Sequence, residues 1–402
     1  MKLLVVCQYY YPENFQVTPI CEQLAQDGYE VTVLTGLPNY PTGVIPPEYR
    51  TGRRDEVIRG VRVIRCHEIG RKTGPLFLAL NYLSYCLSSA LMVGKLPIDF
   101  DAVLVYQLSP VFMALAGKKY AKKRGVPLCI YCCDIWPESL KMYIKNERSP
   151  LFRAVKYLSK RLYESAQKIV CQSPSFVPYF QEAHGISKEK LSCIPAFADE
   201  TYLSQDFTPQ GGSVDFVFMG NLGHAQNLTA LLDAVAQIQH IPGFKVHFVG
   251  DGSCLNQMKQ DVKERGLERI VVFYGRRPVE EMPEFYRLAD ACLISLKADN
   301  RTGLTLPTKL QGYMAAGKPV LGMIDGSARE VIEASGCGVC VPAGDVSGFA
   351  EAMRTFILNP GQFQSCGEKG RRYFKEHFSK AVCMQKLEEE LNRLGEQHHV
   401  CI

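Results

Sequence analysis

The N-terminal part of the chain alternates short apolar runs with amphipathic segments. Residues 3–6 are fully apolar, the pattern of a strand buried on both faces of a parallel sheet. A segment with helical spacing covers 18–27 and ends at Gly28, and residues 30–35 form the next strand-like run. Similar runs recur at 61–65, 102–106, 128–132 and 168–171. This alternation predicts a doubly wound α/β domain that binds ligands at the carboxyl ends of its strands.

The pattern restarts in the second half of the chain. Residues 208–213, TPQGGS, have the composition of an interdomain linker. Strand-like runs then occupy 215–219, 245–249, 270–274, 291–295, 320–323 and 338–341, with helical segments between them. We therefore expect one domain over 1–205, a second over 206–375 and a helical tail over 376–402.

One stretch of the second block, residues 304–321, predicts a loop, a short helix, a tight turn and a strand. Pro307 and Thr308 suit the start of the helix, Gly317 its end, and Pro319 prevents its continuation. Lys309 falls in the first helical turn, where free N–H groups and the helix dipole attract anions. The stretch is thus either a phosphate site or an ordinary αβ unit with a surface lysine.

Composition agrees with a two-domain globular protein. The chain has 402 residues, of which 47% are hydrophobic and 22% charged. The net charge of +5 is unevenly spread, because residues 1–200 hold 25 Lys and Arg against 18 Asp and Glu. The rest of the chain holds 21 against 23. A basic N-terminal half suggests an anionic partner or surface.

The sixteen cysteines are scattered, many of them inside apolar runs. No secretory signal opens the chain, so we expect reduced cysteines in a cytoplasmic protein. Two C-x-x-C pairs, Cys129/Cys132 and Cys337/Cys340, lack the further ligands that zinc needs, and no metal site is expected. His67 and His184 have no partner pattern and are interpreted as structural.

Residues 76–96 form an apolar stretch of membrane-spanning length, with Arg71 and Lys72 in front. Polar residues inside it, and its place within one α/β domain, favour a buried or surface-associated helix over a span. Basic residues cluster at 118–124 and 141–168. Each cluster alone is best explained as a solvated helix face, but beside the apolar helix both favour docking on anionic lipid head groups.

Glycine turns follow several predicted strands of the second domain and predict a nucleotide-diphosphate site. No P-loop motif is present, which disfavours that type of ATP hydrolysis, and no G-x-G-x-x-G opens the first domain, which disfavours a dehydrogenase. Besides Pro307, Thr308 and Lys309, the expected site residues are Gly220, Asn221, Gly223, Gln226, Gly250, Gly275, Arg276 and Arg277.

Two acidic residues of the first domain are candidates for catalysis. Asp134 ends a predicted strand beside Trp136, where a carboxylate can orient or deprotonate a hydroxyl. The alternative is an aspartate that caps a helix starting at Pro137, although Asp134 lies one residue too early. Glu13, in the first loop, is a weaker candidate.

In combination, these motifs make the chain resemble retaining, nucleotide-sugar-dependent glycosyltransferases with the GT-B fold (family 4-like). In particular, it is similar to the bacterial L-fucosamine and fucosyl transferases of O-antigen and colanic-acid biosynthesis. The resemblance spans almost the whole chain. It rests on YYYPE at 9–13, LPNYPTG at 37–43, DIWPES at 134–139, GNLG at 220–223 and the stretch 307–319.

The resemblance implies two Rossmann-like domains that face a cleft, with the acceptor bound by the first and the nucleotide sugar by the second. The last helix is expected to cross back to the first domain. The donor is expected to be a UDP-linked sugar, and the acceptor a polyprenyl-diphosphate-linked saccharide. We expect no cofactor, no metal and no nucleic acid, and a protein attached peripherally to an anionic membrane surface.

The chain departs from the resembling group at two sites. Members often carry Arg and Lys in the first glycine turn of the second domain, where this chain has Asn221 and Gln226. They also often carry two glutamates eight positions apart, where this chain has Leu304 and Gly312. The usual ribose carboxylate is therefore missing, and Lys309 with Arg276 or Arg277 becomes the expected diphosphate clamp. The expected donor-sugar residues are Asp299, Asn300, Arg301 and Gly303.

We therefore expect transfer of a sugar, for example N-acetyl-L-fucosamine, from a nucleotide to a glycan acceptor. Two alternatives stay open. One is a UDP-sugar 2-epimerase of the same fold, which relies on several acidic residues and a histidine. The other is a membrane-docked scaffold that has lost catalysis, suggested by the missing glutamates.

Overall fold

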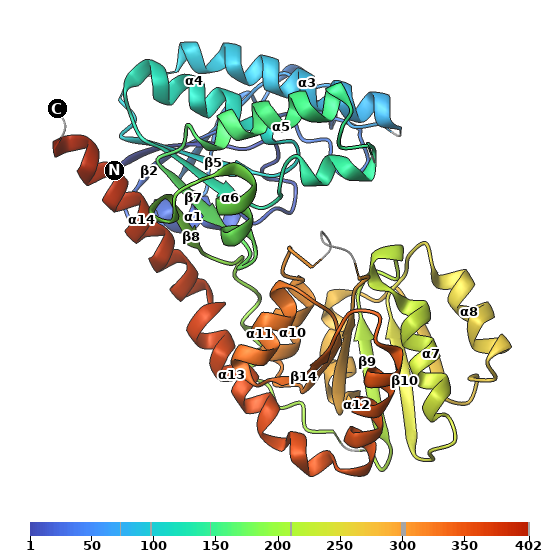
Figure 1. Ribbon diagram of the computed structural model, residues 1–402. Helices are drawn as coiled ribbons and strands as arrows, with labels where there is room; N and C mark the ends of the chain where they lie inside the picture. The colour runs from blue at the N-terminus through green and yellow to red at the C-terminus, as the bar shows by residue number, and fades with distance from the viewer. Residues whose placement is uncertain (73, 97–98, 145, 210, 299–302, 401–402) are drawn as a thin grey trace. The chain divides into compact units, whose positions relative to one another are not determined.

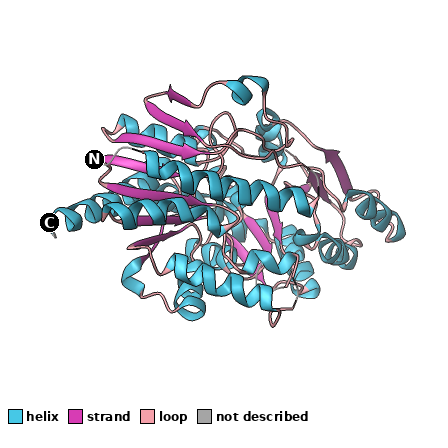
Figure 2. Ribbon diagram, turned by 90° about the horizontal axis from the view of Figure 1, so that it is seen from above, coloured by secondary structure: helices cyan, strands magenta, loops and turns pink. Residues whose placement is uncertain are grey.

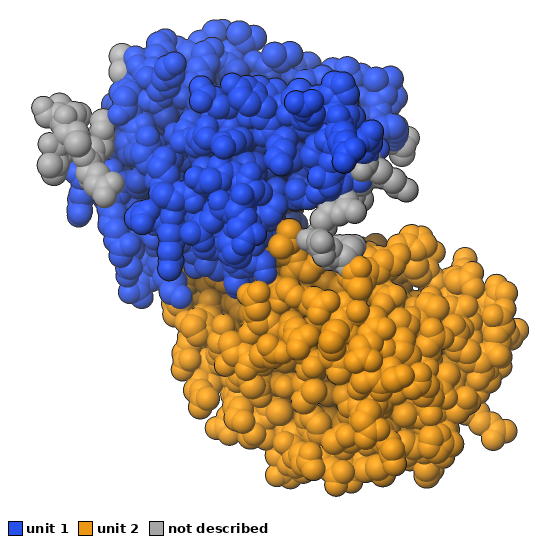
Figure 3. Space-filling model, viewed as in Figure 1, with its two compact units in different colours: residues 1–194, 384–402 blue, residues 195–383 orange. Residues whose placement is uncertain are grey.

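Two parallel sheets, each covered by helices, form the computed structural model (Figures 1 and 2). The model describes residues 1–72, 74–96, 99–144, 146–209, 211–298 and 303–400. It divides into a first unit of 1–194 with 384–402 and a second unit of 195–383 (Figure 3). The prediction of two Rossmann-like α/β domains is confirmed.

The sheet of the first unit has eight strands in the order β3-β4-β2-β1-β5-β6-β7-β8. All its neighbours pair in parallel except β3 and β4, which form an antiparallel hairpin. Strand order reverses at β1, between β2 and β5, which is where doubly wound sheets open a crevice. The strands are β1 (Lys2–Val6), β2 (Glu30–Thr35), β3 (Asp55–Ile58), β4 (Val61–Arg65), β5 (Ala102–Gln107), β6 (Leu128–Cys132), β7 (Lys168–Cys171) and β8 (Leu191–Cys193).

Two lysines of helix α4 form hydrogen bonds that join it to α3 and α5. The Lys119 ammonium donates to the carbonyl oxygen of Ala90 in α3, and that of Lys118 to Arg161 in α5. All three lie on one side of the sheet (Figure 1). The helices of the unit are α1 (Val17–Gln26), α2 (Pro47–Thr51), α3 (Pro75–Met92), α4 (Leu115–Arg124), α5 (Pro150–Tyr163) and α6 (Phe176–His184).

The second unit has a six-stranded parallel sheet in the order β11-β10-β9-β12-β13-β14. Its order reverses between β9 and β12, so the crevice of this sheet is expected there. The strands are β9 (Val214–Met219), β10 (Phe244–Val249), β11 (Val271–Gly275), β12 (Ala291–Ser295), β13 (Val320–Met323) and β14 (Gly338–Val341).

Alternate residues of the strands in this sheet enter two separate cores. Phe216 and Phe218 of β9 belong to one core, with residues of α7, α8 and α12, whereas Val217 and Met219 belong to the other, with residues of α9, α10 and α11. This is the two-residue period of a sheet covered on both faces. The helices are α7 (Leu228–Ile238), α8 (Leu255–Glu264), α9 (Met282–Leu288), α10 (Thr308–Ala315), α11 (Ser327–Ser335), α12 (Val346–Leu358), α13 (Gln364–His377) and α14 (Lys380–Val400).

The domain boundaries differ from those expected. The second unit begins at Pro195 rather than at 206, because Tyr202 and Phe207 pack in its core against Tyr286. The tail returns to the first unit at Met384 rather than at 376. Within that unit, α14 is tied to β7 by an ion pair of 3.2 Å between Lys168 and Glu390.

Candidate functional site

Three successive loops of the second unit are joined at the carboxyl ends of β9, β10 and β11. The Gly220 N–H donates to the carbonyl of Val249, and the Gly250 N–H to that of Gly275, each at 2.9 Å. Gly250 has a φ of +146°, and a Cβ there would lie 1.8 Å from the carbonyl oxygen of Gly220. Only glycine fits this approach, which brings the three loops to one edge of the sheet as the sequence predicted.

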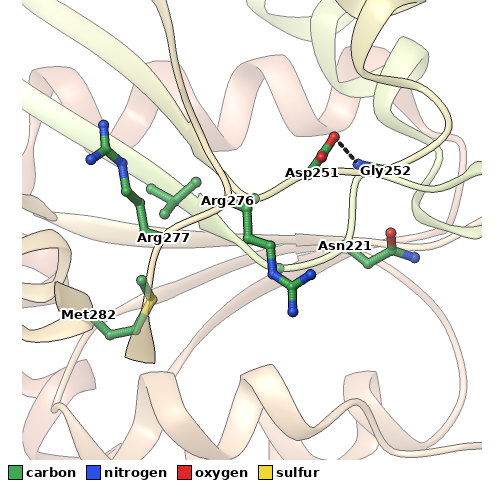
Figure 4. Close-up of a pocket in the computed structure, with 9 residues that line it drawn as sticks. Asn221, Asp251, Gly252, Arg276, Arg277 and Met282 are labelled. Carbon is green, nitrogen blue, oxygen red and sulfur yellow. Dashed lines mark hydrogen bonds between the residues drawn. The ribbon is translucent and has the colours of Figure 1, made fainter. Parts of the chain in front are cut away.

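These loops surround a cavity of about 580 Å³ (Figure 4). The Arg276 side chain points toward the same space as Asn221, whereas Arg277 is turned away from Asn221. Arg277 also lines the cavity, but its Nε donates to the carbonyl of Tyr274 at 3.1 Å and its Nη1 lies 3.6 Å from Glu281. The lining residues are Gly220, Asn221, Val249, Gly250, Asp251, Gly252, Arg276, Arg277 and Met282.

Lys309 reaches the same loops from the first turn of α10. Its Nζ lies 3.2 Å from the position of a Cβ on Gly220 and 3.8 Å from the centroid of the Phe218 ring. It donates to Oε1 of Gln226 at 2.8 Å, which is a neutral partner. Burial lowers the pKa of the Lys309 ammonium from 10.5 to about 7. No carboxylate of the described residues forms an ion pair with Lys309, and such a cation beside a strand-end cavity suits an anionic ligand.

Three further predicted site residues lie in the turn after β9 and at the start of α10. Asn221 folds over Gly223, because a Cβ on Gly223 would lie 2.8 Å from the Asn221 Nδ2. Pro307 is the N-cap of α10, with an extended ψ of 126°, rather than a residue of its first turn. Thr308 then begins the helix and is exposed. The N-terminus of α10 therefore carries Lys309, and no side chain in the described part of the chain caps it.

The position of the missing glutamate is filled by a tyrosine hydroxyl. A Cβ on Gly312 would lie 2.7 Å from the Tyr286 Oη, closer than real side chains approach. Tyr286 comes from α9, one turn beyond the cavity residue Met282, and its ring packs on Tyr202 with centroids 4.9 Å apart. Packing against Tyr286 thus requires glycine at position 312. A glycine there cannot supply the carboxylate that the resembling group often carries.

The structure describes only one of the four predicted donor-sugar residues, Gly303. Asp299, Asn300 and Arg301 lie outside the described residues. Gly303 packs its backbone against the turn that begins α11, where its carbonyl accepts a 2.9 Å bond from the N–H of Ser327. A Cβ on Gly326 would lie 2.2 Å from the same oxygen. Gly303 is therefore fixed by a close backbone contact.

In the first unit, Asp134 follows β6 and is held by two hydroxyl groups. Ser109 and Ser139 each donate to one of its carboxylate oxygens. The indole N–H of Trp136 donates to the Ser109 hydroxyl at 3.0 Å. The carboxylate does not cap a helix N–H among the bonds described, so the capping interpretation is not supported. Its geometry fixes a partly buried carboxylate at a strand end.

Glu13 is a backbone anchor. Its Oε1 accepts the N–H groups of Asn39 and Tyr40 at 2.8 and 2.6 Å. Burial raises the pKa of the Glu13 carboxyl to about 7, and these two N–H groups oppose the rise. Glu13 therefore holds the loop after β2 in place.

The two histidines singled out in the sequence, His67 and His184, differ in environment. His184 is buried among the rings of Tyr163, Tyr179 and Phe180. Burial lowers the pKa of its imidazole to about 4, so it is neutral near pH 7. His67 is exposed, and its backbone carbonyl accepts from the Ser88 hydroxyl. The cysteines of both C-x-x-C pairs are free thiols.

Sequence reasoning missed several residues around these sites. Phe218 lies under Lys309, Tyr286 covers Gly312, and Met282 lines the cavity. It also missed Glu68, a buried carboxyl bonded to Gln8 and Asn81. The first three sit inside a strand or a helix, where the pattern shows a core residue and nothing more, whereas Glu68 lies in the loop after β4.

Two family models match successive parts of the chain. The model for a glycosyl transferase 4-like domain covers 14–196, and the model for glycosyl transferases group 1 covers 200–373. These two spans correspond to the first and second units.

Curated relatives and solved structures are similar to the chain at low identity. A protein of Pseudomonas aeruginosa described as a probable glycosyltransferase, WbjE, is 25% identical over 63% of this chain and 65% of its own length, just under two thirds. The 2-deoxystreptamine glucosyltransferase of Streptomyces kanamyceticus is 22% identical over 90% of this chain and 94% of its own length. The crystal structure of Anabaena HepE in complex with UDP superposes with a TM-score of 0.72 at 17% identity, covering 98% of this chain and 100% of HepE.

Proposed function

Because this chain belongs to the group 1 family of glycosyltransferases, we propose that it moves a sugar from a UDP-linked donor to a glycan acceptor with retention. The observation that carries the donor assignment is the cavity of the second unit, with Arg276 inside it and Lys309 beside Gly220. The structurally similar HepE was crystallised with UDP, which supports the choice of base. A deoxy-N-acetylamino hexose such as N-acetyl-L-fucosamine is the proposed sugar.

Departure of the nucleotide leaves negative charge on the diphosphate. In our proposal, Lys309 and Arg276 stabilise that charge together with the free N–H groups at the start of α10, and neither a metal nor another cofactor takes part. Gln226 holds the Lys309 ammonium at 2.8 Å without neutralising it. Gly220 and Gly250 leave room for the diphosphate to approach the backbone.

Asp134 is the residue that we propose to orient or polarise the acceptor hydroxyl. The bonds from Ser109 and Ser139 fix the direction of the carboxylate, so it can orient or polarise an incoming hydroxyl. Glu13 is assigned a positioning role, since both its backbone contacts hold the loop at 39–40.

A membrane surface is the second proposed partner. The reason is that α3 buries its polar face and exposes its apolar face. Its buried face is polar: Asn81 and Tyr85 bond to the body of the first unit, and Ile69 donates to Ser84 at 3.0 Å. Its outer face carries apolar side chains that are 37–71% exposed: Leu76, Phe77, Leu80, Leu83, Leu87 and Leu91. Burying one leucine is worth about 2 kcal/mol, so this face favours an apolar phase.

Length and composition alone would let 75–95 cross a bilayer. The bonds of Asn81, Tyr85 and Ser88 to the first unit argue against a span, because they make α3 part of the domain core. Helix α5 adds exposed Leu151, Tyr157 and Leu158 on the same side as α3. We propose peripheral docking of this side on the cytoplasmic face of an anionic membrane, where the acceptor is a polyprenyl-diphosphate-linked saccharide.

Calorimetry of the full chain with UDP and with GDP tests the donor assignment. We expect UDP to bind at least tenfold more tightly than GDP. The reaction is then followed with a UDP sugar, with and without a lipid-linked acceptor. Binding of neither nucleotide would favour the inactive scaffold. Conversion of the UDP sugar to its epimer without acceptor would favour a UDP-sugar 2-epimerase.

A further inference from the structure

Three aromatic rings form a platform at the carboxyl ends of β1 and β2 in the first unit. Tyr9 and Phe15 stack with centroids 5.0 Å apart, and Tyr40 lies 5.7 Å from Tyr9 and 5.4 Å from Phe15. Tyr40 remains 44% exposed. An exposed ring supported by two others is a rigid apolar face with a polar tip, which suits the face of a sugar ring.

The platform is built into the backbone of two loops. Glu13 holds the N–H groups of Asn39 and Tyr40, and the Asn39 Oδ1 accepts the N–H of Arg71 at 2.9 Å. Gly43 and Gly70 allow the same loops to touch, because a Cβ on Gly70 would lie 2.2 Å from the carbonyl oxygen of Gly43. The loop that carries Tyr40 is therefore locked to the loop that carries Arg71.

Two cations follow the platform along the chain. The Arg71 guanidinium lies 5.6 Å from the centroid of Tyr40, and the Lys72 ammonium 5.4 Å from that of Phe77. No carboxylate among the described residues forms an ion pair with either side chain. Two consecutive cations without an ion-pair partner among the described residues match the charge of a diphosphate.

Phe77 belongs to the exposed apolar face of α3, so three kinds of surface follow one another along the chain of the first unit. The order is aromatic platform, paired cations and leucine stripe. We propose that this path binds the acceptor: the saccharide on Tyr40, the diphosphate on Arg71 and Lys72, and the polyprenyl chain along Leu76, Leu80 and Leu83. The assignment rests on the proposed glycosyl transfer and names the acceptor's binding residues.

Asp134 lies near this path. Burial raises the pKa of the Tyr82 hydroxyl, and the charges of Arg71, which lowers it, and Asp134, which raises it, both act on that hydroxyl. Tyr82 is on α3, one residue beyond Asn81. A saccharide on Tyr40 with its diphosphate on Arg71 would therefore lie at the edge of the sheet where Asp134 follows β6.

The test measures flotation of the full chain with vesicles. Neutral phosphatidylcholine vesicles carry either no addition, a long-chain polyprenyl diphosphate, the same lipid bearing N-acetylglucosamine, or phosphatidylglycerol of equal charge. We expect at least tenfold tighter binding to the vesicles with the saccharide lipid than to neutral or phosphatidylglycerol vesicles. The double variant Arg71→Ala, Lys72→Ala should lose that gain, and Tyr40→Ala should bind the bare and sugar-bearing lipids equally.

Arg59→Ala is the matched control. Arg59 also stacks on a tyrosine of these loops, Tyr11 at 5.3 Å, but it is paired with Glu22 at 2.9 Å. Its removal should leave binding unchanged. Equal losses for Arg59 and Arg71 variants, or binding that follows vesicle charge alone, would overturn the proposal. The same variants are also titrated with UDP. Their altered side chains belong to the first unit, so UDP binding should be unchanged, and loss of UDP binding would instead concern the donor assignment.

Discussion

The ammonium of Lys309 lies 3.8 Å from the centroid of the Phe218 ring. The ring belongs to β9, two residues before Gly220, and the lysine to α10, so two segments far apart in the chain build one cation site. The contact desolvates the lysine while Gln226 supplies a neutral acceptor. A cation that is weakly hydrated before its ligand arrives gains more from a diphosphate than a solvated one would.

Replacing Lys309 by alanine should lower turnover at least tenfold, which corresponds to about 1.4 kcal/mol of transition-state stabilisation. The loss should appear in kcat, because the charge on the diphosphate grows as the sugar leaves. Steady-state kinetics with a UDP sugar measure it. Lys297→Ala, which removes a lysine from the loop after β12, is the control. Turnover equal to the wild type would remove Lys309 from the mechanism.

The pKa of about 7 for Lys309 predicts pH-dependent donor binding. Below pH 7 the ammonium is charged in the free protein, and above it the amine is neutral. The affinity for a UDP sugar should therefore fall by up to about tenfold per pH unit between pH 7 and 9. Calorimetry across this range measures the slope. Lys309→Arg keeps its charge and should give a flat profile, and a slope in that variant would assign the titration elsewhere.

Gly312→Ala should destabilise the protein even though alanine favours helices by about 1 kcal/mol. The new Cβ would lie 2.7 Å from the Tyr286 Oη, and overpacking of this kind costs about 1–3 kcal/mol. In a Tyr286→Phe background the hydroxyl is gone, and the same substitution should stabilise. Denaturant unfolding of the four variants completes the cycle. Equal effects in both backgrounds would show that the hydroxyl does not set the residue at 312.

Glu68 should make the first unit less stable as pH rises. Burial raises the pKa of its carboxyl from 4.5 to about 8, so the folded state keeps a proton that the unfolded chain releases. The contribution of Glu68 to the free energy of unfolding is fully present below pH 4.5. It falls by up to about 1.4 kcal/mol per pH unit as the pH rises toward 8. Urea unfolding of Glu68→Gln should show a shallower decline than the wild type, and parallel curves would refute a shifted pKa.

The outer face of α3 should control attachment to anionic vesicles. Leu83→Ser with Leu87→Ser removes two exposed side chains from that face and should weaken vesicle binding at least tenfold. Serines at these exposed sites should not lower the thermal midpoint. The control exchanges Val279, an equally exposed apolar residue of the second unit, for serine. Attachment that survives the double substitution would place the membrane surface elsewhere.

The sequence by itself determined the order and type of most of the strands and helices. Runs such as 128–132 and 168–171 coincide with β6 and β7, because strands buried on both faces leave an uninterrupted apolar signature. It also placed Gly220, Gly250 and Gly275 at one edge, since parallel strands bring their carboxyl ends together. It missed β3 and β8, which are short and lie at the sheet edges, where polar residues are tolerated.

Only the tertiary structure decided which side chains act together. It turned Arg276 toward the cavity and Arg277 toward Glu281, placed Tyr286 over Gly312, and turned the leucines of α3 outward. The contacts of Arg277 are local, but the other outcomes depend on contacts between segments far apart in the chain. Periodicity records which positions are apolar and at what spacing they recur. It carries no information about which distant side chain a helical turn or a strand end will contact.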